Sequence, residues 1–111
     1  MEIIEWNDFE KVELRVGTII KVEDYPEAKK PAYKLWVDFG EFGVKKSSAQ
    51  ITKLYKKESL IGKQILAVIN FKPKQIGSFI SEFLTTGFVG DNGEVTLAIP
   101  ERKVKNGSKL A

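Results

Sequence analysis

The chain has 111 residues and a formal net charge of +3, a length that suits a single domain over residues 1–111. It contains no cysteine and no histidine, so disulfides, thiolate nucleophiles and imidazole proton shuttles are excluded, together with the commonest metal ligands. We therefore predict no catalytic residues, no metal and no cofactor, and we take binding as the first hypothesis for function.

Membrane insertion and export are not expected. No apolar stretch approaches the roughly 20 residues of a membrane-spanning helix. The N-terminus carries Glu2 and Glu5 where a signal peptide would carry lysine or arginine. We expect a cytoplasmic protein.

Alternation of apolar and polar side chains predicts the first two strands. Residues 12–22 alternate over a length that predicts a long strand, and Gly17 within it indicates a bulge or a bend. Two prolines then predict a loop over residues 25–31. Residues 33–39 alternate again and form the predicted second strand.

A turn, a third strand and a helix are expected next. Glycines at both ends of residues 40–43 predict a hairpin turn, because glycine permits positive φ, and residues 44–49 are the predicted third strand. Apolar residues from Ile51 onward have helical spacing up to a stop at Gly62, which predicts a helix of two or three turns.

The last part of the chain returns to strands. Residues 65–71 form a compact apolar run that predicts a buried strand, and residues 79–88 alternate as a fifth strand. A sixth strand is expected over 94–99, and Val104 with Leu110 is expected to add a short final one.

Three strands, a helix and two further strands form the order of the oligonucleotide-binding (OB) barrel, an all-β, five-stranded Greek-key fold. We predict this fold, with one short helix between the third and fourth strands. An SH3-like barrel and a small α+β sandwich are the alternatives, although the helix after the third strand argues against the former. OB folds bind ligands on their second and third strands and on the flanking loops.

Charge is strongly segregated along the chain. Residues 1–28 carry eight acidic and three basic side chains, whereas residues 29–74 carry eleven lysines and three acidic side chains. Six aromatic residues are interleaved with these lysines: Tyr33, Trp36, Phe39, Phe42, Tyr55 and Phe71. A basic block with aromatic side chains favours nucleic-acid binding over a merely solvated surface.

Tyr33 and Trp36 fall on opposite faces of the predicted second strand, so one of them is expected in the core. Because large aromatic side chains supply burial first, we expect Trp36 to be the core or interface residue. Tyr33 is then the candidate for stacking on a base, although an exposed aromatic side chain would equally suit an apolar groove for unfolded peptide.

Lysines and short polar side chains on the third strand are candidate RNA contacts. Lys46 and Ser48 share one face of that strand, and Lys45 lies on the other. Near a barrel rim both lysines would reach phosphate. The alternative is a charged edge that blocks strand pairing.

Two amides and a lysine pair complete the candidates from patterning alone. Gln50 offers donors and an acceptor to a base edge or a ribose hydroxyl, or else caps the helix. Asn70 ends the buried strand and either contacts RNA or orders the loop that contains Lys72 and Lys74.

Two charged residues have simpler interpretations. Arg15 stands in an acidic stretch, and we expect a structural ion pair with Glu13 or another carboxylate. Glu82 is a lone strand carboxylate with no histidine or cysteine to assist it, so we predict no catalytic role.

The order and spacing of motifs over residues 9–110 resemble the tRNA-binding domain family. That family includes the C-terminal domain of some methionyl-tRNA synthetases, the endothelial monocyte-activating polypeptide domain, free-standing structure-specific tRNA-binding proteins and CsaA. The matching strings are FEKVELRVGTI (9–19), VDFG (37–40), LIGK (60–63), NFKP (70–73) and Ser81-Glu82. The string KSSAQIT (46–52) and the chain length resemble the CsaA branch.

The resemblance implies an OB-fold homodimer that binds tRNA without catalysis. It also implies an alternative, a chaperone for unfolded preproteins that acts with the Sec preprotein translocase, and one surface could serve either ligand. A general single-strand binder is a third, weaker hypothesis. The dimer is expected to use terminal extensions, namely the N-terminal residues and the segment after about Phe88.

One departure from the family pattern lies where other members carry Ser-Glu-Gly-Met. This chain has Phe83 and Leu84 in place of the glycine and methionine, so contacts made by that methionine are not expected here. The complete set of expected RNA-binding residues is Tyr33, Lys45, Lys46, Ser48, Gln50, Asn70, Lys72, Lys74 and Ser81.

Overall fold

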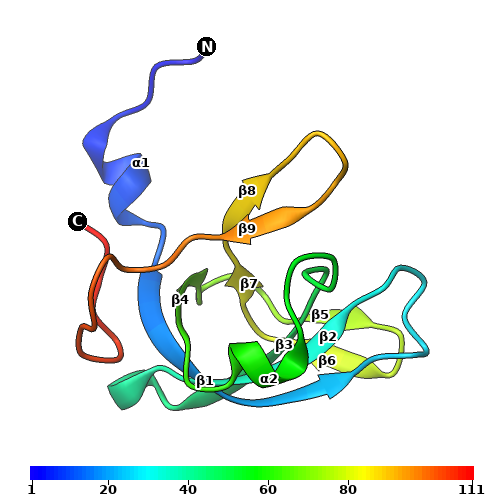
Figure 1. Cartoon of the computed structure of the whole chain (residues 1–111). Coiled ribbons are helices and arrows are strands. Elements are labelled where there is room, and N and C mark those ends of the chain that lie inside the picture. Colours follow the sequence, from blue (N-terminus) through cyan, green and yellow to red (C-terminus); the bar gives the residue numbers. More distant parts are fainter.

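The computed structural model describes all residues from 1 to 111 and consists mainly of strands (Figure 1). Its main sheet has five antiparallel strands in the order β3-β2-β1-β4-β7. The bounds are β1 Leu14–Asp24, β2 Tyr33–Asp38, β3 Val44–Ala49, β4 Gln64–Val68 and β7 Leu84–Thr85. This nearly closed all-β barrel confirms the predicted OB fold.

β1 is long because it serves two partners. Its first half pairs with β4 and its second half with β2, and the register shifts between Ile19 and Lys21. The bulge is therefore not at Gly17. A Cβ atom at Gly17 would lie 2.5 Å from Val37 Cγ1 and 2.6 Å from Phe39 Cδ1, so glycine there leaves room for core side chains.

The barrel closes between β3 and the segment between β6 and β7. The Glu82 backbone N–H donates to the Lys46 carbonyl at 2.8 Å. In return, the Lys46 backbone N–H donates to Glu82 Oε1 at 2.9 Å. Glu82 therefore pairs with Lys46 as a residue of a neighbouring strand would, with its backbone N–H as donor and its carboxylate as acceptor. Its side chain has a structural role in closing the barrel.

The smaller elements lie around this barrel. Helix α1 (Trp6–Glu10) precedes β1, the 3-10 turn η1 (Gly40–Phe42) joins β2 to β3, and helix α2 (Lys57–Leu60) precedes β4. Two short hairpins extend from the barrel, β5 (Lys74–Ile76) with β6 (Phe79–Ser81), and β8 (Gly87–Val89) with β9 (Val95–Leu97).

Several predicted bounds were wrong. The predicted strand over 79–88 is divided into β6, β7 and β8, because its successive parts pair with three different strands. The predicted helix from Ile51 is reduced to the single turn of α2. The expected final strand is only a bridge between Lys109 and Arg15, although backbone hydrogen bonds continue to Leu110.

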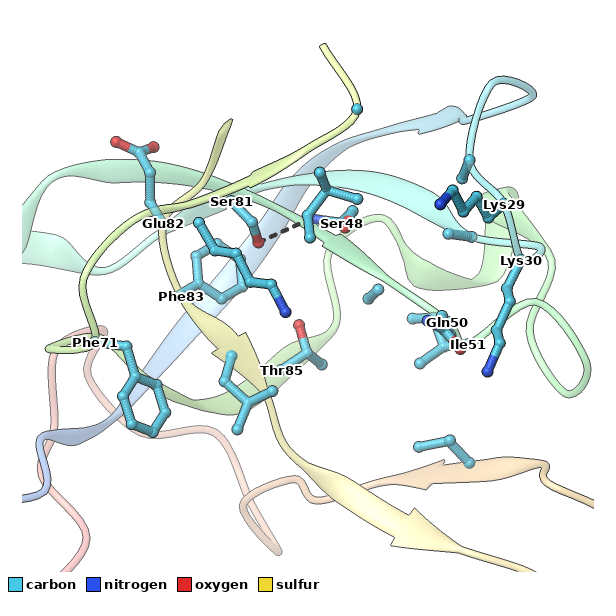
Figure 2. A pocket seen from close by; sticks show the side chains of 18 of the residues that line it. Lys29, Lys30, Ser48, Gln50, Ile51, Phe71, Ser81, Glu82, Phe83 and Thr85 are labelled. Atoms are coloured by element: carbon cyan, nitrogen blue, oxygen red, sulfur yellow. Dashed lines mark hydrogen bonds between the residues drawn. The ribbon is translucent and has the colours of Figure 1, made fainter. Parts of the chain in front are cut away.

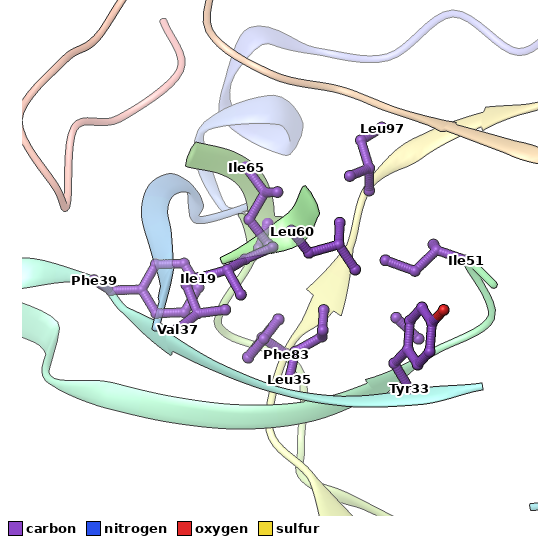
Figure 3. Close-up of a cluster of buried hydrophobic side chains, with 12 residues drawn as sticks. Ile19, Tyr33, Leu35, Val37, Phe39, Ile51, Leu60, Ile65, Phe83 and Leu97 are labelled. Atoms are coloured by element: carbon purple, nitrogen blue, oxygen red, sulfur yellow. The ribbon is translucent and has the colours of Figure 1, made fainter. Parts of the chain in front are cut away.

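The core lies inside the barrel and matches the alternation of β1 and β2. Ile19, Leu35, Val37 and Phe39 are fully buried, together with Leu60 of α2, which covers one end (Figure 3). No helix of the structure is both long and apolar enough to cross a bilayer.

Candidate nucleic-acid interface

A groove with a volume of about 820 Å³ lies beside β3. Its walls come from the β1–β2 loop, the end of β3, the segment after β4, and the β5–β6 hairpin with β7 (Figure 2). These are the strand and loop positions at which OB folds bind oligonucleotides. The groove is therefore the first candidate for an RNA site.

Tyr25 holds two walls of this groove together. It is buried at the start of the β1–β2 loop, and its hydroxyl donates a hydrogen bond to the Ile76 carbonyl of the β5–β6 hairpin. Gly77 accepts the close approach of that hydroxyl, since a Cβ there would lie 2.7 Å from it and φ is +62°. The proline-bounded loop and the hairpin are thereby fixed relative to each other.

The groove carries an excess of positive charge. Its charged lining residues are the four lysines Lys29, Lys30, Lys72 and Lys74 and the two glutamates Glu27 and Glu82. None of these four lysines makes an ion pair. The acidic N-terminal stretch does not neutralise them. Of the eleven lysines in residues 29–74, only Lys57 has an ion pair, to Asp24 at 2.7 Å, and that carboxylate raises the Lys57 pKa.

Polar side chains lie along the β3 side of the groove. The Ser81 hydroxyl is 2.6 Å from the buried Ser47 hydroxyl and accepts from the Ser48 backbone N–H at 3.4 Å. Gln50 is exposed and makes no hydrogen bond within the protein, so its amide is available to a ligand. Together these groups offer both donors and acceptors at one wall.

Of the nine residues predicted from sequence, the groove brings together five, namely Ser48, Gln50, Lys72, Lys74 and Ser81. It also contains residues that sequence reasoning did not select, chiefly Lys29, Lys30, Phe71 and Thr85. The two lysines could have been found from their position between two prolines in the loop that OB folds use for binding.

The expected orientation of Tyr33 and Trp36 was reversed. Tyr33 lies in the core, 9% exposed, and its hydroxyl donates to the Tyr55 carbonyl at 2.8 Å. Its ring is therefore not available for stacking. Trp36 lies on the opposite face of β2 and faces outward between β1 and β3. There the Phe79 ring of β6 meets the indole edge-to-face, with ring centres 5.9 Å apart.

Lys46 belongs to this outer surface rather than to the groove. Its ammonium lies 5.2 Å from the centre of the Phe79 ring, and Lys21 lies 4.5 Å from the centre of Trp36. Such cation–π contacts position the lysines while leaving their charge in place. Lys45 is half-buried on the opposite face of β3 and does not line the groove.

Asn70 serves the fold. Its Oδ1 accepts from the Glu13 backbone N–H at 3.0 Å and its Nδ2 donates to the Lys11 carbonyl at 2.7 Å. The amide therefore joins the end of β4 to the segment after α1, and the prediction of an RNA contact is not supported by its position. Asn70 instead orders the backbone, as the alternative prediction had it. The segment that it orders is the one at Lys11 and Glu13, however, and not the loop that contains Lys72 and Lys74.

The predicted ion pair of Arg15 is confirmed. Its Nε and Nη2 donate to Glu13 Oε1 at 3.0 and 2.6 Å, and its Nη1 donates to the Gly107 carbonyl at 3.1 Å. The Arg15 hydrogen bond, with Lys109 nearby, lowers the Glu13 pKa. This cluster ties the C-terminal segment to β1.

The departure from the family pattern has a structural explanation. Phe83 is buried and packs edge-to-face on Phe39 with ring centres 5.2 Å apart, so the larger residue completes the core. Leu84 is 51% exposed and lines the groove. No group of three or more His, Cys, Asp or Glu residues is arranged to hold a metal ion.

Comparison with known proteins identifies the family. The family model described as "Putative tRNA binding domain" matches residues 14–109. The chain belongs to the tRNA-binding domain family. Two similar solved structures indicate the CsaA branch, since CsaA from Bacillus anthracis is 46% identical with a TM-score of 0.94, and CsaA from Picrophilus torridus is 52% identical with a TM-score of 0.92.

Those two solved structures match this member of the CsaA branch over nearly their whole length. The alignments cover 99% and 98% of this chain and 100% of both solved chains, whose descriptions call them chaperones. The methionine–tRNA ligase of Methanocaldococcus jannaschii is 36% identical over 99% of this chain. The chain spans only 17% of the length of that ligase.

Proposed function

We propose that this protein binds tRNA non-catalytically along the groove beside β3. The observation that carries the proposal is the set of four lysines without ion pairs in an OB-type groove of a tRNA-binding domain family member. Lysine contacts to phosphate supply affinity through counterion release. Gln50 and Ser48 add polar contacts to sugar or base edges. With tRNA as the partner, we propose a cytoplasmic location.

A double substitution of the loop lysines tests this proposal. We expect Lys29→Ala with Lys30→Ala to weaken tRNA binding and to reduce the slope of log K against log salt by about 0.7 to 0.9 for each phosphate that a lysine no longer neutralises. Lys103→Ala with Lys105→Ala is the matched control, because it removes the same charge from exposed residues outside the groove. Equal effects of the two pairs would refute a localised site.

The protein is further proposed to be a homodimer. Large apolar side chains are exposed on the N-terminal segment and on the β8–β9 hairpin, including Ile3 at 93%, Trp6 at 66% and Val89 at 75%. Both regions project from the same end of the barrel in Figure 1. An apolar surface of this kind is typical of a protein interface.

Sedimentation tests the dimer. We expect the mass of a dimer for the natural chain and a monomer for Val89→Asp. Leu54→Asp, an exposed apolar position outside both regions, is the control and should leave the dimer intact. A natural chain that sediments as a monomer at micromolar concentration would contradict the proposal.

A second candidate function is binding of unfolded preproteins, with the Sec translocase as a downstream partner. The names of the two CsaA structures and the apolar side chains in the groove, among them Phe71 and Leu84, favour it. Apolar burial tolerates salt better than phosphate contacts do. Binding of a denatured protein that persists at a salt concentration where tRNA dissociates would support this function.

A further inference from the structure

Thr85 supplies the starting observation. Its Oγ1 is the only buried side-chain polar atom without a hydrogen-bond partner in the protein. Buried hydroxyls nearly always have a partner, so an orphan one requires an explanation. Thr85 lines the groove, and in Figure 2 its hydroxyl is directed into the space between the groove walls.

Apolar surface lies in the same groove. Phe71 is 58% exposed and Leu84 is 51% exposed, and half-buried Val95 extends this lining. Exposed aromatic faces in basic grooves stack on unpaired bases, and each base has such a face whatever its sequence. A phosphate alone would leave Phe71 unused, whereas a nucleotide uses the ring, the hydroxyl and the lysines together.

The backbone of β3 disfavours an extended peptide as the occupant. A peptide that adds to a sheet needs free backbone groups at a strand edge. Here the Lys46 N–H is taken by the Glu82 carboxylate at 2.9 Å and the Ser48 N–H by the Ser81 hydroxyl at 3.4 Å. The excess of lysine over glutamate in the groove also favours an anionic ligand.

We propose that the groove takes one unpaired nucleotide of the bound RNA. Its base stacks on Phe71, its base edge or ribose hydroxyl exchanges a hydrogen bond with Thr85, and its phosphate contacts the groove lysines. The inference rests on the proposed tRNA binding and adds which part of the RNA is bound. Bases within a duplex cannot present their faces to Phe71, so the nucleotide must be unpaired. Recognition would then require a loop or an end of the RNA as well as its charge.

The experiment compares three RNA probes by fluorescence titration. They are a whole tRNA, a single-stranded octanucleotide with a central 2-aminopurine, and a blunt RNA duplex of the same length. Stacking on an aromatic ring quenches 2-aminopurine. We expect the natural protein to quench the octanucleotide and to bind it more tightly than the duplex.

Substitutions at Phe71 and Thr85 separate stacking from charge. Phe71→Ala should weaken octanucleotide binding about 5- to 150-fold and abolish the quench, whereas Phe71→Tyr should retain both. Thr85→Val should weaken binding about 2- to 10-fold. It should not lower the Tm, because the hydroxyl it removes has no partner in the free protein. Leu54→Ala, outside the groove, should change nothing.

The outcomes distinguish the inference from the function on which it rests. If the Lys29 and Lys30 substitutions weaken tRNA binding but Phe71→Ala and Thr85→Val do not, the nucleotide pocket is refuted and tRNA binding stands. If the natural protein binds no tRNA, the proposed function itself fails before any variant is made. If a denatured protein displaces the octanucleotide from a Phe71-dependent site more effectively than tRNA does, the occupant is a peptide and the inference is overturned.

Discussion

Replacing Ser47 with alanine tests how the barrel closes between β3 and the chain from β6 to β7. The Ser47 hydroxyl is fully buried, donates to the Phe83 carbonyl at 2.6 Å and lies 2.6 Å from the Ser81 hydroxyl. Alanine leaves that carbonyl and Ser81 without this partner. Groups left unsatisfied in this way cost about 1 to 3 kcal/mol of the free energy of unfolding.

The expected change in melting temperature follows from the size of the chain. With an unfolding entropy of about 2.1 cal/mol/K per residue, that reduction in stability corresponds to a Tm lower by about 4 to 13 °C. Circular dichroism during heating and in urea measures it. Ser48→Ala is the matched control, because the neighbouring hydroxyl is half-buried and donates no hydrogen bond, so its effect should stay within about 0.5 kcal/mol.

Equal destabilisation of the two serine variants would refute the role of the Ser47 hydroxyl in closing the barrel. A natural Tm in Ser47→Ala would refute it as well. Since Ser81 lines the groove, weakened closure should also weaken ligand binding in Ser47→Ala measured well below its Tm.

Two further substitutions have defined outcomes. Because Arg15 lowers the Glu13 pKa in the folded protein, the pair stabilises the fold above the ordinary Glu13 value of 4.5, and this contribution is lost as the pH falls below it. Glu13→Gln should flatten that part of the stability–pH curve, and an unchanged acid limb would contradict it. Gly17→Ala forces a methyl group against Val37 and Phe39 and should cost about 1 to 3 kcal/mol in urea denaturation. A stability equal to that of the natural chain would show that the core relaxes freely.

The positions of the candidate site residues show where sequence reasoning succeeded. Ser48, Gln50, Lys72 and Lys74 were selected because they lie on the predicted third strand or beside the fourth, and the groove contains all four. Asn70 was selected by the same argument. Its amide is instead used by Lys11 and Glu13, and a hydrogen bond between residues 57 positions apart leaves no signal in local patterning.

Local periodicity was sufficient for the strands that form the barrel. Period-two alternation places Leu35 and Val37 on one face of β2 whatever the surrounding structure, since successive side chains of a strand point to opposite sides. The order of the strands around the helix then leaves the OB barrel as the favoured fold. The order and spacing of the motifs over residues 9–110 also predicted the family, and the family model that matches residues 14–109 confirms it.

Only the tertiary structure decided what covers the outer face of β2 and what surrounds the groove. Alternation places Tyr33 on the same face of β2 as Leu35 and Val37, so its burial agrees with the pattern, whereas the packing of Phe79 on Trp36 at the outer face has no signal in the pattern. The Thr85 hydroxyl and the Phe71 ring share a groove through contacts between distant segments. Periodicity records the side to which a residue points, whereas its neighbours depend on how the sheet curves and where its hairpins fold back.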